Sequence, residues 1–283
     1  MEYQNPQVPE GINVSKQHPL KEFAWMLATV GAITLAVVLV LSLLAGWLVK
    51  FVPFSVEQQL AQQVISQLPA SEPSSRHQQT QQYLQELADK LVANAPLPDG
   101  MSITVHYVDD NIVNAAATLG GHVLMYRGLL EKLPNENALA MVMAHEIAHV
   151  RHRDPLMALG RGVVVTTALA AISGFSDSQL SSWVVGLGSN LTLLKFSRDQ
   201  EHAADENGLL ALHATYGHTG GSEQLFEVLA QAHGDGEAWA TFLATHPLSD
   251  ERIAELAKLA AENGWQQQGD LTPLPEFLAK PEQ

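Results

Sequence analysis

Two histidines and a glutamate near the middle of the chain have the spacing of a metal-dependent hydrolase site. His145, Glu146 and His149 form an H-E-x-x-H pattern inside a run of strong helix formers, residues 138–150. Four residues apart on a helix, the two histidines project from one face, where both imidazoles can bind a single zinc ion. Glu146 projects beside them and can take a proton from a metal-bound water and pass it to a leaving amine. The pattern predicts peptide-bond hydrolysis with one Zn2+ per chain.

The surroundings of this pattern favour a real site over a chance match in a chain with 12 histidines. Pro134 and Asn135 form a helix start signal, and no Gly or Pro interrupts residues 138–150. Charged residues in an apolar helix are costly to bury without partners. A bound metal would provide the partner.

A second pattern, further along the chain, offers the third protein ligand that a catalytic zinc needs. Glu201 and Asp205 stand four residues apart on a helix expected over residues 193–208, flanked by the small residues Ala203 and Ala204 that allow close helix packing. We assign Glu201 as the third ligand. Asp205 is assigned as the carboxylate that accepts a hydrogen bond from a ligand imidazole and orients its ring.

These two patterns together resemble a known family. The sequence H-E-I-A-H-V-R-H-R-D at residues 145–154, followed by S-R-D-Q-E-H-A-A-D at 197–205, is similar to the gluzincin metallopeptidases that include the heat-shock protease HtpX and the CAAX prenyl protease. The resemblance covers roughly residues 57–260. It implies a membrane-associated zinc endopeptidase with ligands at His145, His149 and Glu201, and it adds misfolded or envelope proteins as the expected substrates.

The same resemblance extends to the segment H-P-x-x-x-x-R at residues 246–252. It implies that His246 and Arg252 lie near the reaction centre, as a donor to the oxyanion or as a support of the carboxylates. His246 could instead be only the turn before a helix that Ser249 caps. HtpX and the CAAX prenyl protease carry several membrane spans, whereas one span is expected here, so prenylated substrates are not expected. No tetratricopeptide-like extension is expected after the domain, and therefore no large partner-binding array.

The elements that must position these residues indicate an α+β fold, a mostly helical zincin-like domain with a small sheet. Strands are expected over residues 102–108, 112–119 and 122–126. Residues 114–117 are the predicted edge strand, where an extended substrate could pair, with Asn114, Ala115 and Ala116 as the predicted substrate-binding residues. An ordinary hairpin packed on the helix is the alternative.

Helices are expected before and after these strands in the sequence. Residues 55–68, 78–94, 222–232 and 250–262 have helical spacing of their apolar positions. Two apolar runs, 156–175 and 183–194, separate the zinc patterns. We expect them to be core helices; a hairpin at the membrane surface is the alternative.

The N-terminal part predicts one transmembrane helix over residues 23–49, which carry no charge and exceed the ~20 residues needed to cross a bilayer. A buried core helix and a cleaved signal peptide are the alternatives. Residues 1–22 then form a polar tail, 55–263 the metallopeptidase domain and 264–283 a second polar tail. Lys16 and Lys21 before the span and Lys50 after it weakly favour a single-pass bacterial inner-membrane protein with a periplasmic domain.

Composition narrows the partners. The formal net charge of −15 with 15 basic residues argues against nucleic acid, and the absence of Cys excludes thiolate zinc ligands. The expected partners are protein or peptide substrates and a lipid bilayer contacted through residues 23–49. The rival hypothesis is a non-catalytic zinc-binding envelope chaperone or scaffold, which would be free to lose Glu146, yet Glu146 is present.

Overall fold

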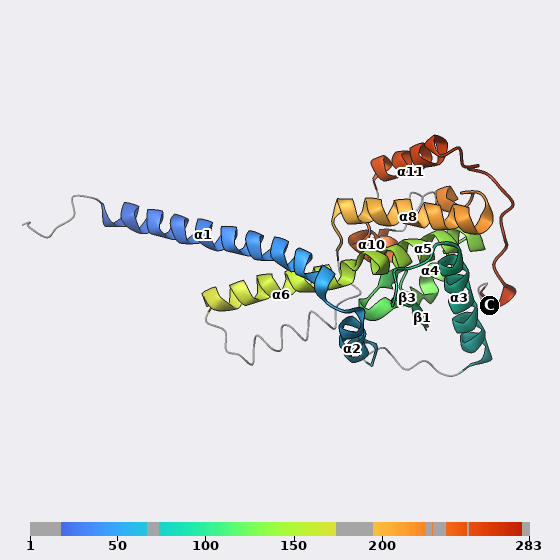
Figure 1. The fold of residues 1–283 in the computed structure, drawn as a ribbon, viewed down its shortest axis with the longest axis horizontal. Coiled ribbons are helices and arrows are strands. Elements are labelled where there is room, and N and C mark those ends of the chain that lie inside the picture. The colour runs from blue at the N-terminus through green and yellow to red at the C-terminus, as the bar shows by residue number, and fades with distance from the viewer. Residues whose placement is uncertain are drawn as a thin grey trace, which may run out of the picture.

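The computed structural model describes residues 18–66, 74–173, 195–224, 228, 236–247 and 249–278. This part of the chain is mostly helical with one small sheet, and a long helical arm projects from the body that holds the sheet (Figure 1). The predicted α+β class is confirmed.

The arm is helix α1, Pro19–Leu48, which continues through the 3-10 turn η1, Val49–Phe51. None of the α1 side chains is buried. Within the described residues it is the one helix long and apolar enough to cross a membrane. It begins before the predicted span, because Pro19 fits the first helical turn, where no amide hydrogen is needed.

The sheet has the strand order β1-β3-β2, with β1 at Thr104–Val108, β2 at Ala115–Ala117 and β3 at His122–Tyr126. Strand β3 pairs in parallel with β1 and antiparallel with β2, so β2 is an edge strand. The predicted strand 112–119 is shortened because Ile112 donates its backbone N–H to the Asp110 side chain in a turn. The 3-10 turn η2, Leu119–Gly121, connects β2 to β3.

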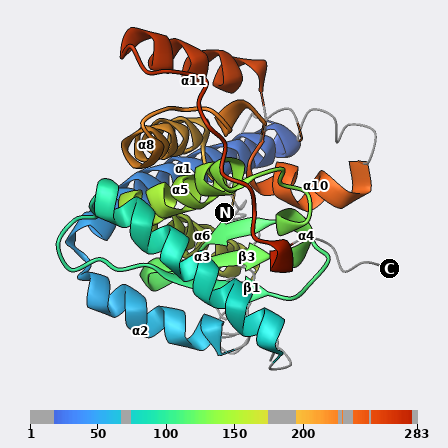
Figure 2. The ribbon, with the colours of Figure 1, turned by 90° about the vertical axis from the view of Figure 1, so that its right-hand side faces the viewer.

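Helices form layers over this sheet (Figure 2). Helix α5, Glu136–His152, packs on β2 and β3, α8, Arg198–Tyr216, packs on α5, and α11, Asp250–Glu262, packs on α8. Helix α3, Ser75–Asn94, contacts β1, α5 and α8. The remaining described helices are α2 at Phe54–Ile65, α4 at Arg127–Leu130, α10 at Gly236–Thr245 and the 3-10 turn η5 at Glu276–Leu278.

Helix α6, Asp154–Ser173, corrects one expectation. It lies beside α1 in the arm and not in the core (Figure 1). A Cβ added at Gly160 would lie 3.6 Å from Ala45 Cβ, so the small residue allows the two helices to approach closely. Because Arg153 ends α5 in a left-handed conformation, α6 starts in a new direction, away from the body. The predicted apolar run 183–194 lies outside the described residues.

The C-terminal segment, expected to be a polar tail from residue 264, packs on the body over its described part. Trp265 stacks on His213 with ring centroids 4.7 Å apart, and Leu278 is buried. The Glu136 N–H donates to the Thr272 carbonyl at 2.9 Å, so this segment also holds the start of α5. Most of the helix predicted over 222–232 lies outside the described residues.

Candidate metal centre

Helix α5 brings the two histidines together in the core. Asn135 caps its start by accepting the Ala138 N–H at 2.9 Å, and the helix then runs without a break to His152. His145 and His149 direct their Nε2 atoms to the same point, 3.1 Å apart. Their side chains are 6% and 0% exposed, so the pair is closed off from bulk water.

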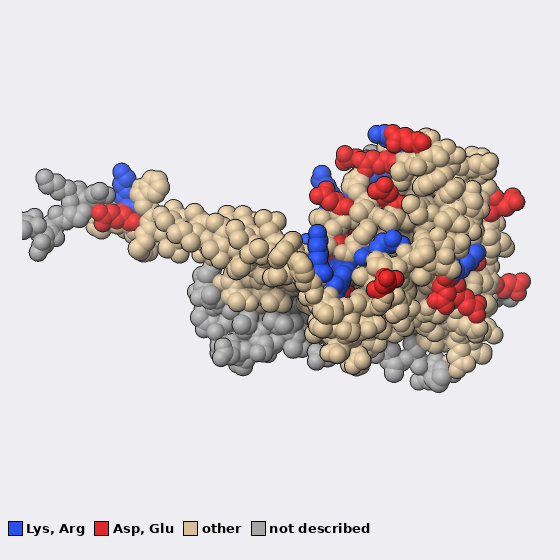
Figure 3. All heavy atoms as spheres, in the orientation of Figure 1, with Lys and Arg blue, Asp and Glu red and all other residues tan. Residues whose placement is uncertain are grey.

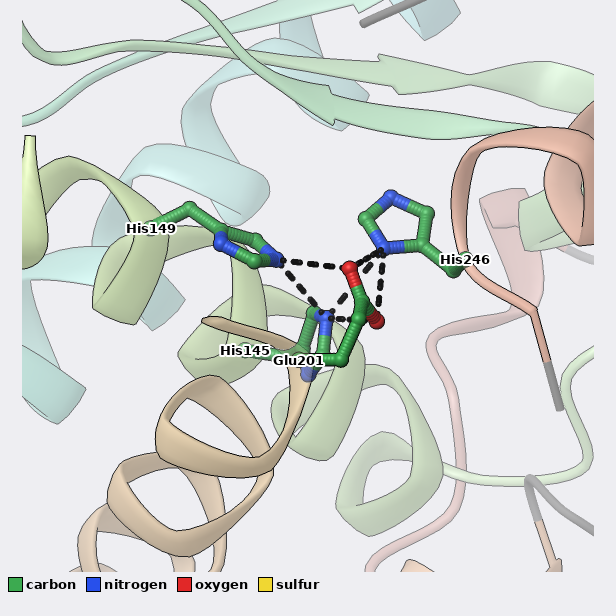
Figure 4. Close-up of side chains that lie close together, drawn as sticks. All are labelled: His145, His149, Glu201 and His246. Carbon is green, nitrogen blue, oxygen red and sulfur yellow. Dashed lines mark hydrogen bonds and ion pairs between the residues drawn. The ribbon is translucent and has the colours of Figure 1, made fainter. Parts of the chain in front are cut away.

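Helix α8 brings Glu201 to this pair. Ser197 starts α8 with a capping box, which fixes the first turn from which Glu201 projects. Its Oε2 lies 3.5 Å from His145 Nε2 and its Oε1 lies 3.5 Å from His149 Nε2. The structure therefore brings together the three residues that the sequence predicts as ligands (Figure 4).

His246, directly after α10, lies closer to these atoms than the sequence suggested. Its Nδ1 is 3.3 Å from His145 Nε2 and 3.2 Å from Glu201 Oε1 (Figure 4). Ligand atoms of all four residues lie within 4.8 Å of one another and could hold a metal ion. Such a buried cluster of nitrogen and carboxylate donors has the chemistry that zinc prefers.

Glu146 lies on α5 next to His145 and is 0% exposed. Its Oε2 accepts the backbone N–H of Ala117 at 2.7 Å, which fixes the carboxylate against the edge strand. Its Oε1 lies 3.5 Å from His246 Nε2 and has no hydrogen-bond partner among the described residues. One carboxylate oxygen is thus held by the backbone, and the other is left to accept a proton.

Two further carboxylates contact the outer nitrogens of the paired imidazoles. Asp205 Oδ1 lies 3.0 Å from His145 Nδ1, as the sequence suggested, and Asp205 also accepts two hydrogen bonds from Arg252, at 2.6 and 2.8 Å. Asp154 Oδ2 lies 2.8 Å from His149 Nδ1. Sequence reasoning missed Asp154, although an acidic residue just past the end of the helix is a signal that could have found it.

Phe196, which precedes the α8 cap, was also missed. Its ring stacks on the His149 imidazole with centroids 4.1 Å apart and restricts the orientation of that ring. An aromatic residue before a helix cap carries no sequence signal for such a contact. Arg252 also reaches Glu201, with 3.1 Å between Nη2 and Oε2, so it contacts two carboxylates of the centre.

The buried charges change the proton affinity of the centre. Burial alone would lower the pKa of His145, but hydrogen bonds to Asp205 and Glu201 outweigh burial and raise that pKa to about 10. The pKa of His149 is raised in the same way, against burial, by Asp154 and Glu201. Burial would raise the pKa of Glu201, yet hydrogen bonds from the imidazoles lower it well below its usual range. The centre therefore holds carboxylates that strongly attract cationic groups.

The residues predicted to bind substrate lie beside Glu146, at the edge of the sheet. Asn114, Ala115 and Ala116 have exposures of 1%, 0% and 6%. The Tyr126 N–H donates to the Asn114 carbonyl and the Thr118 N–H donates to the His122 carbonyl. Alternation along β2 therefore turns the Ala115 backbone groups to the outer edge. The edge position is as expected, whereas the side chains are buried against the body.

An H-E-x-x-H helix over a small sheet, with a glutamate supplied by a second helix, defines a metallopeptidase class of site. Comparison with known proteins agrees: residues 78–260 match the family model of peptidase family M48. The chain belongs to peptidase family M48.

Its relatives in that family come from bacteria and from a fungus. The chain is 31% identical to the mitochondrial metalloendopeptidase OMA1 of Schizosaccharomyces pombe over 65% of this chain and 54% of that protein. It is 26% identical to the beta-barrel assembly-enhancing protease of Escherichia coli over 62% of this chain and 37% of that protein. It is 34% identical to the metalloprotease YcaL of Escherichia coli, over 51% and 57%. The chain thus matches little more than half of the length of these relatives, or less.

Proposed function

We propose that this chain is a membrane-anchored, zinc-dependent metalloendopeptidase that hydrolyses peptide bonds in misfolded or envelope proteins. The observation that carries the proposal is the meeting of His145, His149 and Glu201 around one point. Glu146 Oε1, which has no hydrogen-bond partner among the described residues, lies 3.5 Å from His246 Nε2 beside this cluster. Membership of peptidase family M48 supports the same activity.

Zinc fits the proposed ligands because two imidazole nitrogens and one carboxylate form a donor set that leaves a fourth position for water. When bound, the ion would supply Lewis acidity and bring the pKa of a water at the site towards neutrality. Asp205 and Asp154 would hold the outer nitrogens of the ligand rings protonated, which directs each Nε2 to the ion.

Glu146 is the proposed general base. Its carboxylate would accept the proton of the attacking water and then deliver it to the leaving amine. His246 is the proposed hydrogen-bond donor to the oxyanion that forms at the reacting carbonyl. The donor atom would be its Nε2, which lies 3.5 Å from Glu146 Oε1. Arg252 is proposed to support the carboxylates, because it donates to Asp205 and lies 3.1 Å from Glu201.

Strand β2 is the proposed substrate-binding edge. An extended peptide that pairs with the outward backbone groups of Ala115 would run past Glu146, because Ala117 of the same strand already donates to that carboxylate. The small side chains of Ala115 and Ala116, with Asn114 before them, would let the peptide backbone approach closely.

The arm is the proposed membrane anchor. Its exposed apolar surface over α1 is unsuited to water, and its length exceeds what a bilayer requires. We propose a single span over residues 23–49 in a bacterial inner membrane, with the domain of residues 55–263 in the periplasm. Lys16 and Lys21, which precede the span in the sequence, are the basis for that orientation.

The test of the function is Glu146→Gln in the full chain, with casein as the substrate. The substitution keeps the hydrogen-bond acceptor for Ala117 but removes the base, so the variant should hold as much zinc as the parent and cleave about 10²–10⁴-fold more slowly. Glu206→Gln, an exposed position on α8, is the control and should change neither property.

Two other results would contradict the proposal in different ways. Cleavage by the Glu146→Gln variant at the parent rate would show that Glu146 is not the base. A parent protein that holds zinc but cleaves no protein substrate would instead favour the non-catalytic chaperone or scaffold.

A further inference from the structure

An ion pair outside the candidate metal centre, between the buried Glu57 and the partly buried Arg153, joins three separate parts of the chain. Glu57 of α2 is 0% exposed, and Arg153 donates to it from Nε at 3.0 Å and from Nη2 at 2.7 Å. Neither residue belongs to the four-residue donor cluster. Burying two charges costs desolvation free energy that their attraction only partly offsets, so stability alone does not explain the pair.

Arg153 controls the end of the helix that carries the histidines. Its φ of +60° is left-handed, a conformation that residues other than glycine rarely adopt, and the pair with Glu57 holds its side chain in place. The next residue is Asp154, whose carboxylate lies 2.8 Å from His149 Nδ1. A rotation of the Arg153 backbone would therefore move the group that orients His149.

Glu57 controls the turn that follows the edge strand. Its Oε1 accepts the Gly120 N–H at 3.1 Å. A Cβ on Gly120 would lie 2.8 Å from the Cα of Gln58, so α2 is packed directly on this turn. Strand β2 ends three residues earlier at Ala117, which donates to Glu146. A shift of Glu57 would therefore move strand β2 and, through Ala117, the proposed base Glu146.

Arg153 also holds the body end of the arm. Its Nη1 donates to the carbonyl of Val49 at 3.1 Å and to the carbonyl of Val52, where the chain leaves α1 and η1 for α2. Basic side chains gather in this region, where the arm meets the body, as Figure 3 shows. One guanidinium therefore contacts the end of the arm and the buried carboxylate of α2 at the same time.

We infer that Glu57 and Arg153 are positioning residues that couple the body end of α1 to the metal centre, through Asp154 on one side and through the Gly120 turn on the other. This inference rests on the proposed zinc peptidase function. The pair touches neither substrate nor the donor atoms, so its loss should affect metal retention and kcat more than KM. Coupling between two sites is reciprocal, so metal binding should also change the junction at Val49–Val52.

The variants for the test separate charge from backbone geometry. Glu57→Gln keeps an acceptor for the Gly120 N–H but removes the charge. Arg153→Gly suits the left-handed backbone but removes the guanidinium, and Arg153→Lys restores a positive charge. Arg151→Ala is the matched control, because it removes the same positive charge from the same helix end. Arg151 donates to the Ala95 and Pro96 carbonyls and not to Glu57.

The measurements use the full chain in detergent micelles, with zinc and casein as probes. We expect Glu57→Gln and Arg153→Gly to raise the zinc Kd about tenfold and to lower kcat with little change in KM, as loss of an outer support of a metal ligand does. Arg153→Lys should recover part of this loss, and Arg151→Ala should match the parent. Hydrogen exchange at the Gly120 and Val52 amides should quicken when zinc is removed from the parent, and this response should disappear in Glu57→Gln.

The outcomes distinguish this inference from the function on which it rests. If the parent neither retains zinc nor cleaves casein, the proposed function fails. If the parent does both, but the pair variants change only the thermal unfolding temperature and leave zinc Kd, kcat and the exchange response as in the parent, the coupling is overturned and the pair is only structural.

Discussion

Replacing Asp205 with Asn tests whether the buried carboxylates hold the proposed metal ligands in place. Asp205 is 3% exposed and accepts hydrogen bonds from His145 Nδ1 and, at two points, from Arg252. The amide of Asn keeps one acceptor oxygen, but its NH₂ group replaces the second oxygen and cannot accept a hydrogen bond from His145 or Arg252. The substitution should therefore weaken both the orientation of His145 and the burial of Arg252.

The magnitudes follow from these contacts. Removing such an outer partner of a ligand imidazole lowers metal affinity by about 10–100-fold, or about 1.4–2.7 kcal/mol of binding free energy. Breaking a buried ion pair costs about 3–5 kcal/mol of stability, and the Asp205→Asn variant should lie near 3 kcal/mol because Arg252 keeps Glu201 at 3.1 Å. With an ordinary unfolding free energy of about 5–15 kcal/mol, the variant should stay folded.

Zinc affinity is measured by competition with a chromogenic chelator, and stability by urea unfolding in excess chelator. Glu206→Gln, one residue further along α8 and exposed, is the control and should match the parent in both. A variant that unfolds more easily but binds zinc as tightly as the parent would show that Asp205 serves only the fold. Parent-like values in both measurements would refute the whole argument for this carboxylate.

Two further predictions concern the sheet and its turns. Burial and the neighbouring His122 lower the pKa of His106 to about 4, below the value near 6.5 in the unfolded chain. Because the unfolded chain therefore binds the proton more readily, the free energy of unfolding falls as the pH drops from about 6.5 to 4. In urea unfolding with chelator present, His106→Gln should remove about 2 kcal/mol of this acid-induced loss, and an unchanged pH dependence would contradict the assignment. Gly121→Ala should lower stability by about 3 kcal/mol or more, because φ is +84° and the added Cβ would lie 1.9 Å from the Ser102 carbonyl oxygen. Gly217→Ala, with φ of +78° and nothing within 4 Å of the added Cβ, should lose only about 1 kcal/mol in the same urea unfolding assay. Equal losses in the two variants would show that the close approach at Gly121 is unimportant.

The sequence predicts best what depends on local spacing. His145 and His149 must share a helix face once Asn135 starts that helix, and Glu201 is four residues from Asp205 on any helix that contains both. Their meeting across α5 and α8 needs close packing, which Gly208 allows, since its added Cβ would lie 3.3 Å from the His145 backbone nitrogen. Sequence spacing alone does not predict this contact between α5 and α8.

Features that depend on the direction the backbone takes after a helix ends were harder to predict. Helix α6 has the apolar composition of a core helix, but the left-handed backbone at Arg153 sends it along α1 instead. The same change of direction brings Asp154 back to His149, which is why a residue outside the helix pattern contacts a proposed ligand. The packing of residues 265–278 on the body depends on isolated contacts such as Trp265 on His213, for which a polar segment carries no periodic signal.

The candidate metal centre contains more buried negative charge than its single arginine can balance. The carboxylates are at most 3% exposed, and they belong to Glu146, Asp154, Glu201 and Asp205. Within the described part of the chain, Arg252 is the buried cationic side chain that contacts them directly. Carboxylates so far from water require compensating cations.

Protonated imidazoles supply part of that compensation, because the pKa of His145 is raised to about 10 and that of His149 is also raised. A divalent cation would supply the same charge at the same place, and the imidazoles must lose their Nε2 protons to bind it. Zinc binding should therefore release protons near neutral pH. The carboxylates that orient the rings thus also create the demand for a cation, so one set of buried charges serves both the geometry and the affinity of the centre.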